Sequence, residues 1–328
     1  MSYRNASLVD LCQILTELCR EVSDNDVTGS VSLSNVRWCT SSRFQQTNAL
    51  NIPTSAEDHQ MKIKKCYFSI NESGIKSNMD LLKVAIYSCA EHAKLQPVLL
   101  YTGDAVPELD QLKALGAQII HHTVTFEDDL AYGYGSNYKK FVGHWLRVDI
   151  PLVEHSDDYV IYADCDILFR HSPNIGALPY YISAAPEFSK NNWSYFNSGS
   201  MIINIENMRR IHPEFVKNIK NRLRNNFKTP PHDQGSFNEF FGDKFDRLPL
   251  EMNWKPYWEE NPNASMIHFH GLKPAVAIRA QTIPDYQMTD NIRRLWEKNK
   301  RAYVDYTAEY TKILHESESI LSTKLPTT

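Results

Sequence analysis

The sequence has no run of about 18 apolar residues, the length that a membrane-spanning helix requires. Its beginning also shows none of the charged, apolar and small-residue regions that mark a secretory signal peptide. The 35 Lys and Arg residues are outnumbered by 39 Asp and Glu residues, and no basic patch favours a nucleic-acid partner. We therefore expect a cytoplasmic protein that binds no nucleic acid.

Closely spaced cysteine pairs are also missing, because the six cysteines are scattered and several lie in apolar segments. This pattern disfavours zinc sites and disulfide frameworks and favours buried free thiols. No internal repeat divides the chain. With 328 residues, of which 42% are hydrophobic, it can bury a full core and should be globular.

Composition divides the chain into three expected parts: an N-terminal helix and polar linker (1–60), a central domain (61–279) and a C-terminal helical extension (280–328). Apolar residues at helical spacing predict the first helix over 8–22, which either docks on the central domain or forms a homodimer contact. A second helix is expected over 290–322. Its basic cluster favours a solvated face over contact with anionic lipid, because Glu297 dilutes the positive charge.

Short apolar runs alternate with longer amphipathic stretches in the central part. Strands are expected at 66–70, 97–103, 117–124 and 159–166, with helices between them at 79–93, 108–116 and 139–153. This alternation is typical of βαβ units, so the predicted fold class is α/β with a mainly parallel mixed sheet. Ligands of such sheets bind outside the carboxyl ends of the strands.

Two aspartates stand at one such strand end, in the sequence YVIYADCDILF. Residues two apart in a strand project to the same side, so Asp164 and Asp166 should present their carboxylates together. Two adjacent carboxylates repel, and either a cation or a raised pKa must relieve the repulsion. The alternative is a strand end whose aspartates meet only water.

Further polar groups follow between apolar runs, and they are Asn197 in YFNSGSMIINI, Asp233 and Gln234 in HDQGSFNEFF, and His268, His270 and Lys273 in SMIHFHGLKP. Each could be structural when taken alone, since an aspartate at a helix start is often only a cap. Together, carboxylates and an imidazole suit a divalent cation. A cation beside a lysine would stabilise a departing diphosphate. The residues therefore indicate metal-assisted displacement of a nucleotide diphosphate.

The order of the segments YADCD, FNSG, HDQGSFN, LPLEMNW and HFHGLKP resembles that of retaining, metal-dependent glycosyltransferases of the GT-A fold, family 8, the glycogenin and galactosyltransferase-like group. The resemblance covers residues 65–274. It implies a GT-A fold with a Rossmann-like nucleotide-binding sheet, and flanking helices at both termini. The implied activity is transfer of a hexose from a nucleotide-diphosphate sugar, with uridine diphosphate the expected nucleotide, to a hydroxyl acceptor such as a glycan.

The resemblance also implies residue roles. The implied metal ligands, for Mn²⁺ or else Mg²⁺, are Asp164, Asp166 and His268, although His270 competes with His268 for this role. The implied catalytic residues are Arg147, Asp233, Gln234 and Lys273, with Lys273 on the diphosphate and the pair of Asp233 and Gln234 beside the reacting carbon. The implied donor-binding residues are Ile70, Asn71, Asp164, Asn197, Gly271 and Lys273. Only Leu272 separates Gly271 from Lys273, a shorter spacing than the family has.

Two other classes of protein share some of these features with a transferase. A phosphatase of the haloacid dehalogenase type also has a DxD at a strand end, but its motif requires Thr or Val where Leu168 stands. A non-catalytic protein that binds a sugar nucleotide or a glycan would be expected to lack a metal ligand or the lysine, and none is missing. Four aromatic residues, Trp193, Trp254, Tyr257 and Trp258, could stack on an acceptor sugar or simply pack in the core.

Overall fold

A mixed sheet of seven strands in the order β3-β2-β1-β4-β7-β6-β8 is the central element of the computed structural model, which describes residues 63–225 and 232–325. The strands are β1 (Lys65–Asn71), β2 (Gln96–Thr102), β3 (Gln118–His121), β4 (Tyr159–Ala163), β6 (Ile182–Pro186), β7 (Phe196–Asn204) and β8 (Asp246–Arg247). Strand β7 runs antiparallel to β4 and β6, and the remaining pairings are parallel. The predicted mainly parallel mixed sheet is thus confirmed.

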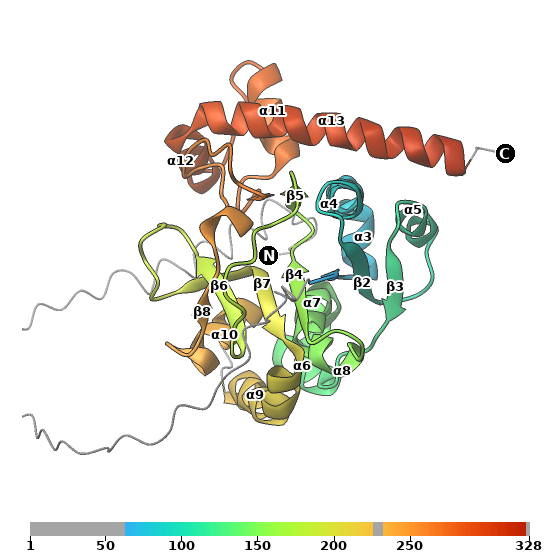
Figure 1. Ribbon diagram of the computed structural model, residues 1–328, viewed down its shortest axis with the longest axis vertical. Helices are drawn as coiled ribbons and strands as arrows, with labels where there is room; N and C mark the ends of the chain where they lie inside the picture. Colours follow the sequence, from blue (N-terminus) through green and yellow to red (C-terminus); the bar gives the residue numbers. More distant parts are fainter. Residues whose placement is uncertain (1–62, 226–231, 326–328) are drawn as a thin grey trace, which may run out of the picture. The chain divides into compact units, whose positions relative to one another are not determined.

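Both faces of the sheet are buried by helices. In β1, Cys66, Phe68 and Ile70 pack into one apolar cluster, whereas Tyr67 packs into the cluster on the opposite face. This alternation, with a buried residue at every position after Lys65, is expected for a parallel strand covered on both sides. Figure 1 shows α4 and α5 on one side of the sheet and α6, α8 and α9 on the other.

The helices on these faces connect successive strands. Their bounds are α3 (Glu72–Ser77), α4 (Met79–Glu91), α5 (Glu108–Ala114), α6 (Glu127–Tyr134), α7 (Tyr138–Trp145), α8 (Ile150–Val153), α9 (Ile205–Asn225) and α10 (Asp233–Phe241). Short 3-10 turns are η1 (Gly135–Asn137), η2 (Leu146–Asp149) and η3 (Leu250–Met252). The helix expected over 79–93 corresponds to α4, and the one over 108–116 corresponds to α5.

The helix expected over 139–153 differs from the structure, because it is divided into α7, η2 and α8. Pro151 lies in the first turn of α8, where the missing amide hydrogen costs no helical hydrogen bond. The tighter η2 turn carries Arg147 and Asp149, and both side chains are buried. The break therefore determines where these two charged groups point.

A second sheet of two strands lies beside the first, formed by β5 (Ile167–Phe169) and β9 (Met266–His268) in antiparallel pairing. The chain then continues into α11 (Pro274–Thr282), α12 (Asp290–Lys298) and α13 (Lys300–Lys324). The single helix expected over 290–322 is two helices, since the Asn299 side chain accepts from the Ala302 amide (3.1 Å) and caps α13. Helix α13 packs on α4 and α11 (Figure 1).

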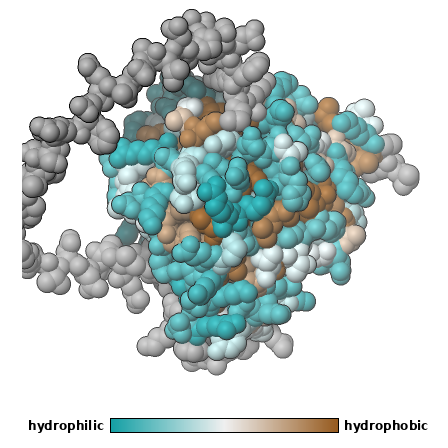
Figure 2. Space-filling model, turned by 60° about the horizontal axis from the view of Figure 1, so that its bottom comes forward, coloured by the Kyte–Doolittle hydropathy of each residue, from teal (hydrophilic) through white to brown (hydrophobic). Residues whose placement is uncertain are grey.

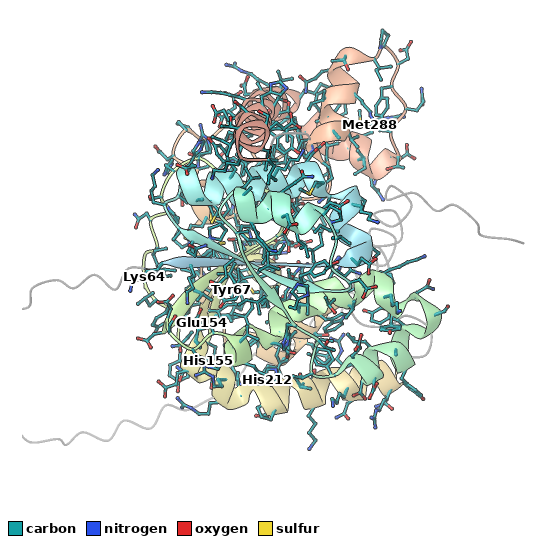
Figure 3. The ribbon with its side chains drawn as sticks, turned by 90° about the vertical axis from the view of Figure 1, so that its right-hand side faces the viewer. Lys64, Tyr67, Glu154, His155, His212 and Met288 are labelled. Carbon is teal, nitrogen blue, oxygen red and sulfur yellow. The ribbon has the colours of Figure 1, made fainter. Side chains whose placement is uncertain are left out.

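Buried polar pairs tie the sheet to the helices. Tyr67 of β1 donates to Glu154 after α8 (2.7 Å), and the two residues lie side by side in Figure 3. Lys65 forms an ion pair with the same carboxylate (2.8 Å). Cys66 and Cys89 are buried free thiols, as predicted, while three other cysteines and the helix expected over 8–22 lie outside the described residues.

The face of the molecule drawn in Figure 2 is mainly hydrophilic, with hydrophobic residues visible in smaller patches between the polar ones. Among the residues that the structure describes, none of the helices combines the length and apolar character needed to cross a bilayer. The boundaries of the three expected parts stay a prediction.

Candidate active site

The two aspartates of the DxD motif lie in the turn that joins β4 to β5. Strand β4 ends at Ala163, and the Ile167 amide donates to the Asp164 carbonyl (3.2 Å). The Asp164 amide in turn donates to the Gly199 carbonyl of β7 (2.8 Å). The motif follows the carboxyl end of a strand, as predicted. Asp164 and Asp166 do not share a strand face, contrary to the sequence prediction, because both lie beyond Ala163 in the turn that brings them together.

Strand β9 places His268 beside these carboxylates. His268 pairs with Ile167, the residue after Asp166, across the two-stranded sheet. Its Nε2 atom lies 3.3 Å from Asp166 Oδ1. One ligand atom from each of Asp164, Asp166 and His268 lies within 4.8 Å of the others. The structure therefore brings together the three residues predicted to bind a metal, although they come from distant parts of the sequence.

These three residues fit a divalent cation. Two carboxylates and an imidazole form a donor set that accepts Mn²⁺ or Mg²⁺. Gly199 leaves the space between them open, since a Cβ atom there would lie 2.4 Å from His268 Cε1 and 2.6 Å from Asp164 Oδ2. Burial lowers the pKa of His268 despite the opposing effect of Asp166, and this favours the neutral ring that a metal ligand requires.

Lys273 reaches the same cluster from the start of α11. Its ammonium forms an ion pair with Asp166 Oδ2. Burial raises the pKa of Asp166, but Lys273 and His268 outweigh this effect and hold the pKa well below its usual range. Gly271, in the loop before Lys273, has a φ of +76° and lies against α12, where a Cβ would come within 2.5 Å of Leu295.

Arg147 of η2 connects the DxD turn to the first turn of α10. Its guanidinium pairs with Asp164 Oδ1 (2.8 Å) and with Asp233 Oδ2 (3.2 Å). The Nη1 atom of Arg147 donates to the Ser198 carbonyl (3.0 Å), and the guanidinium carbon lies 4.3 Å from the centroid of the Tyr162 ring. A planar guanidinium can serve these acceptors at once, which an ammonium cannot.

Gln234 and Asn197 meet on the other side of Arg147. Asp233 and Gln234 form the first turn of α10, which begins where the sequence predicted a helix start. Gln234 Oε1 accepts from the Ser198 amide (3.0 Å) and from Asn197 Nδ2 (3.1 Å). Along β6 the register shifts by several residues at this point, since Ala184 pairs with Met201 but Ala185 pairs with Asn197. Such irregularities re-aim side chains next to active sites.

His270 is placed differently from His268. Its Nε2 atom pairs with Glu187 (3.0 Å), and its Nδ1 atom lies 3.0 Å from the Tyr257 hydroxyl. Glu187 and Asn253 are buried polar residues that sequence reasoning missed. For Glu187 a signal existed, because it directly follows the apolar strand ISAAP and so stands at a strand end, where ligands of α/β sheets bind.

Ile70 and Asn71 lie at the carboxyl end of β1, beside the site. Ile70 is buried in the core, and Asn71 Nδ2 donates to Ser73 Oγ (2.9 Å) and to the Lys139 carbonyl. These contacts hold α3 and α7 against β1. The expected role of both residues in nucleotide binding stays a prediction.

The four aromatic residues considered as acceptor platforms divide into two groups. Trp254 and Tyr257 are only 5% and 3% exposed, so both are core residues. Trp258 and Trp193 are partly exposed, and Trp193 lies under the Arg247 guanidinium at 4.7 Å. Core packing therefore explains the first pair without any role in acceptor binding.

No protein-family model and no curated protein matches the chain. Several solved structures are similar to it in fold. The apo glycosyltransferase GlyE of Streptococcus pneumoniae TIGR4 has a TM-score of 0.48 and 18% identity, over 79% of this chain and 64% of its own length. The galactosyltransferase LgtC, in complex with donor and acceptor sugar analogues, has a TM-score of 0.49 and 16% identity, over 70% and 99% of the two chains. Mouse xyloside xylosyltransferase 1 has a TM-score of 0.45 and 15% identity, over 64% and 98%.

Proposed function

We propose that the protein is a metal-dependent retaining glycosyltransferase. It would move a hexose from a nucleotide-diphosphate sugar, with uridine diphosphate as the expected nucleotide, to a hydroxyl acceptor such as a glycan. One observation carries the proposal: the convergence of Asp164, Asp166 and His268, with Lys273 bound to Asp166 and Arg147 bound to Asp164. A site with clustered carboxylates, one imidazole and two fixed cations suits a polyanionic leaving group.

The cation held by Asp164, Asp166 and His268 would neutralise charge on the diphosphate. Lys273 supports the same task, because its ammonium lies within reach of the metal-binding carboxylates and carries a fixed positive charge. Arg147 holds Asp164 and Asp233 in place through its two ion pairs. Preorganised charges of this kind need no rearrangement when the leaving group departs.

Gln234 and Asn197 would orient the donor sugar. The Gln234 carbonyl oxygen is already engaged by the Ser198 amide and by Asn197, so its amide nitrogen is left to face the sugar. In the proposed reaction the bond from the anomeric carbon to the phosphate oxygen breaks, and a bond to the acceptor oxygen forms on the same face. The departing phosphate oxygen takes the acceptor's proton. Asp233 keeps its contact with Arg147 (3.2 Å) and forms no bond to the sugar.

The decisive experiment screens the purified full chain against a panel of nucleotide sugars with Mn²⁺, following release of the nucleotide. We expect one donor to be turned over, and excess EDTA to abolish the turnover. Asp166→Asn should lower the rate by about 100-fold or more, because it removes a metal ligand. The matched control is Asp129→Asn, which changes another buried, ion-paired aspartate, bound to Lys220 and Arg224 (3.2 and 2.7 Å).

Full turnover in EDTA would reject the metal requirement. Tight binding of a nucleotide sugar without any turnover, with or without an acceptor, would instead support the non-catalytic binding protein. The Asp129→Asn control should unfold more easily but keep the wild-type rate of donor turnover. It therefore shows whether a lower rate in Asp166→Asn comes from a general loss of stability.

A further inference from the structure

Asn253 is a fully buried residue that lies between the metal-binding cluster and the predicted sugar-binding residues. Its Oδ1 atom lies 2.8 Å from His268 Nδ1, and its Nδ2 atom donates to Asn197 Oδ1 (3.0 Å). Asn197 in turn contacts Glu187 (2.8 Å). Four buried side chains thus form one continuous line of hydrogen bonds that ends at the Nδ1 atom of the predicted metal ligand.

The direction of every hydrogen bond in this line can be worked out from groups whose roles are fixed. The Gly199 backbone amide can only donate, and it donates to Asn197 Oδ1 (3.1 Å). At the other end, burial raises the pKa of Glu187, but His270 outweighs this effect and the pKa is lowered to about 2. Glu187 is therefore an acceptor. The Asn197 side chain must then point its oxygen toward Gly199 and its nitrogen toward Glu187.

The same logic determines the orientation of Asn253 and His268. Asn197 Oδ1 accepts, so the group of Asn253 that faces it must be the NH2. The Oδ1 atom of Asn253 then faces His268, and because an amide oxygen can only accept, the imidazole must donate from Nδ1. The neutral ring has one N–H group. Its lone pair therefore lies on Nε2, the atom directed at Asp166 (3.3 Å).

We infer that Asn253 is a positioning residue that holds His268 in the Nδ1–H tautomer, so that Nε2 is available to a divalent cation. The inference rests on the proposed metal site. It goes beyond that proposal by assigning a task to a residue that touches neither the cation nor the donor. The line of hydrogen bonds also links the ligand to Asn197 and Glu187, so that displacement of either end would disturb the other.

The test is the tautomer of His268 in the metal-free protein, read from ¹⁵N-detected NMR spectra of the imidazole rings. The His268 signals are assigned by their absence from His268→Gln. We expect Nδ1–H in the wild type. In Asn253→Leu the ring loses its acceptor at Nδ1, and we expect a shift to Nε2–H with donation to Asp166. Asn253→Asp keeps an acceptor at this position and should keep Nδ1–H, which covers the case that the Leu variant does not fold.

Mn²⁺ titration of the same full-length variants provides the second measurement. Loss of the orienting hydrogen bond should weaken Mn²⁺ binding by about 10- to 100-fold in Asn253→Leu. The matched control is Asn204→Leu, which removes a different buried amide, one at the end of β7 that donates to the Tyr159 hydroxyl and the Pro179 carbonyl (3.0 and 3.3 Å). The control should lose stability but keep the His268 tautomer and the Mn²⁺ affinity.

An Nε2–H tautomer in the wild type, or an unchanged tautomer in Asn253→Leu, would overturn the inference. The result for the proposed function is separate. If the wild type binds no Mn²⁺ while the tautomer shifts as expected in Asn253→Leu, the proposed metal site fails but the positioning role of Asn253 is upheld.

Discussion

Gly199 and His268 approach so closely that a single methyl group on Gly199 would lie 2.4 Å from the Cε1 atom of the imidazole. Real carbon atoms do not come this near without displacement, and neither the backbone of β7 nor the buried ring can move freely. We predict that Gly199→Ala weakens Mn²⁺ binding by about tenfold or more, because the ring must turn away from Asp166. Titration calorimetry on the full chain measures this change.

Gly235→Ala is the control for this prediction. Outside its own helix backbone, the nearest described atom to a Cβ at Gly235 in α10 would be the Tyr195 hydroxyl oxygen at 3.8 Å, an ordinary contact, so this variant should keep the Mn²⁺ affinity of the wild type. Alanine also has a higher helix propensity than glycine. Equal affinity in Gly199→Ala and the wild type would show that the cation does not bind at this position.

Arg147 is expected to be irreplaceable by lysine. The guanidinium contacts Asp164, Asp233 and Ser198 from three directions, whereas a lysine ammonium at this position can reach only part of that set. Each lost hydrogen bond to a charged group is worth about 1.5 to 3 kcal/mol. We therefore predict that Arg147→Lys lowers kcat/KM by about 10- to 100-fold, measured with the donor identified in the screen.

Arg209→Lys provides the comparison, because Arg209 is a partly buried arginine that donates to two backbone carbonyls, those of Pro151 and Glu154. It should change the midpoint of urea unfolding with little effect on kcat/KM. If Arg147→Lys behaves in the same way, Arg147 has a structural role only.

The positions of the chemical groups could be predicted where they depend on local sequence. The apolar runs that become β1, β2 and β4, the start of α10 at Asp233 and the location of the DxD after β4 all follow from short-range patterns. The three residues expected to hold a metal do lie close together, but Asp164 and Asp166 meet in a turn and not on a shared strand face.

The residues that sequence reasoning missed depend on long-range packing. Asn253 becomes informative only when β9 brings His268 beside it and β7 brings Asn197 to its other side. No short motif predicts such a meeting, because its partners come from separate elements. The choice between His268 and His270 was undetermined for the same reason: Glu187, which pairs with His270, comes from β6.

Acid should weaken the fold through Asp149. This fully buried carboxylate accepts from His122 (2.9 Å), His212 (2.8 Å) and the Thr125 amide (2.7 Å). Burial raises its pKa, but these hydrogen bonds outweigh that effect and lower the pKa to about 2. Since the pKa is lower in the folded state than the value of about 3.9 in the unfolded chain, the stabilisation is present above pH 4 and is lost as the pH falls toward 2.

Asp149→Asn tests this prediction, because an asparagine side chain cannot ionise in this pH range. We compare the free energy of unfolding of the wild type with that of the variant, measured by urea unfolding at each pH. The advantage of the wild type over the variant should be larger at pH 5 than at pH 2 by about 2 kcal/mol. A constant difference between the two proteins across this range would contradict the lowered pKa. Glu154, whose pKa is also lowered to about 2, contributes equally to both proteins and cancels in the comparison.

Two retaining mechanisms assign different tasks to Asp233 and Gln234. A double displacement would need Asp233 to attack the anomeric carbon, but its Oδ2 atom is held by Arg147 Nε at 3.2 Å, which lowers its reactivity as a nucleophile. Gln234 is held equally firmly, through the Ser198 amide and Asn197 (3.0 and 3.1 Å), in a position to support positive charge on the sugar. We therefore favour attack on the same face, and predict an α-linked product from an α-configured donor.

Both mechanisms retain configuration, and variants at Asp233 separate them. If Asp233 is the nucleophile, Asp233→Asn should abolish turnover, and mass spectrometry of the wild type mixed with a slow donor should detect a glycosyl group on this residue. If the reaction proceeds on one face, Asp233→Asn should retain measurable activity, because the variant weakens the contact with Arg147 without removing a nucleophile, and no glycosylated enzyme should accumulate. The anomeric coupling constant of the product, measured by NMR, checks the step common to both. A β-linked product from an α-configured donor would require inversion, and it would reject the proposed retaining reaction.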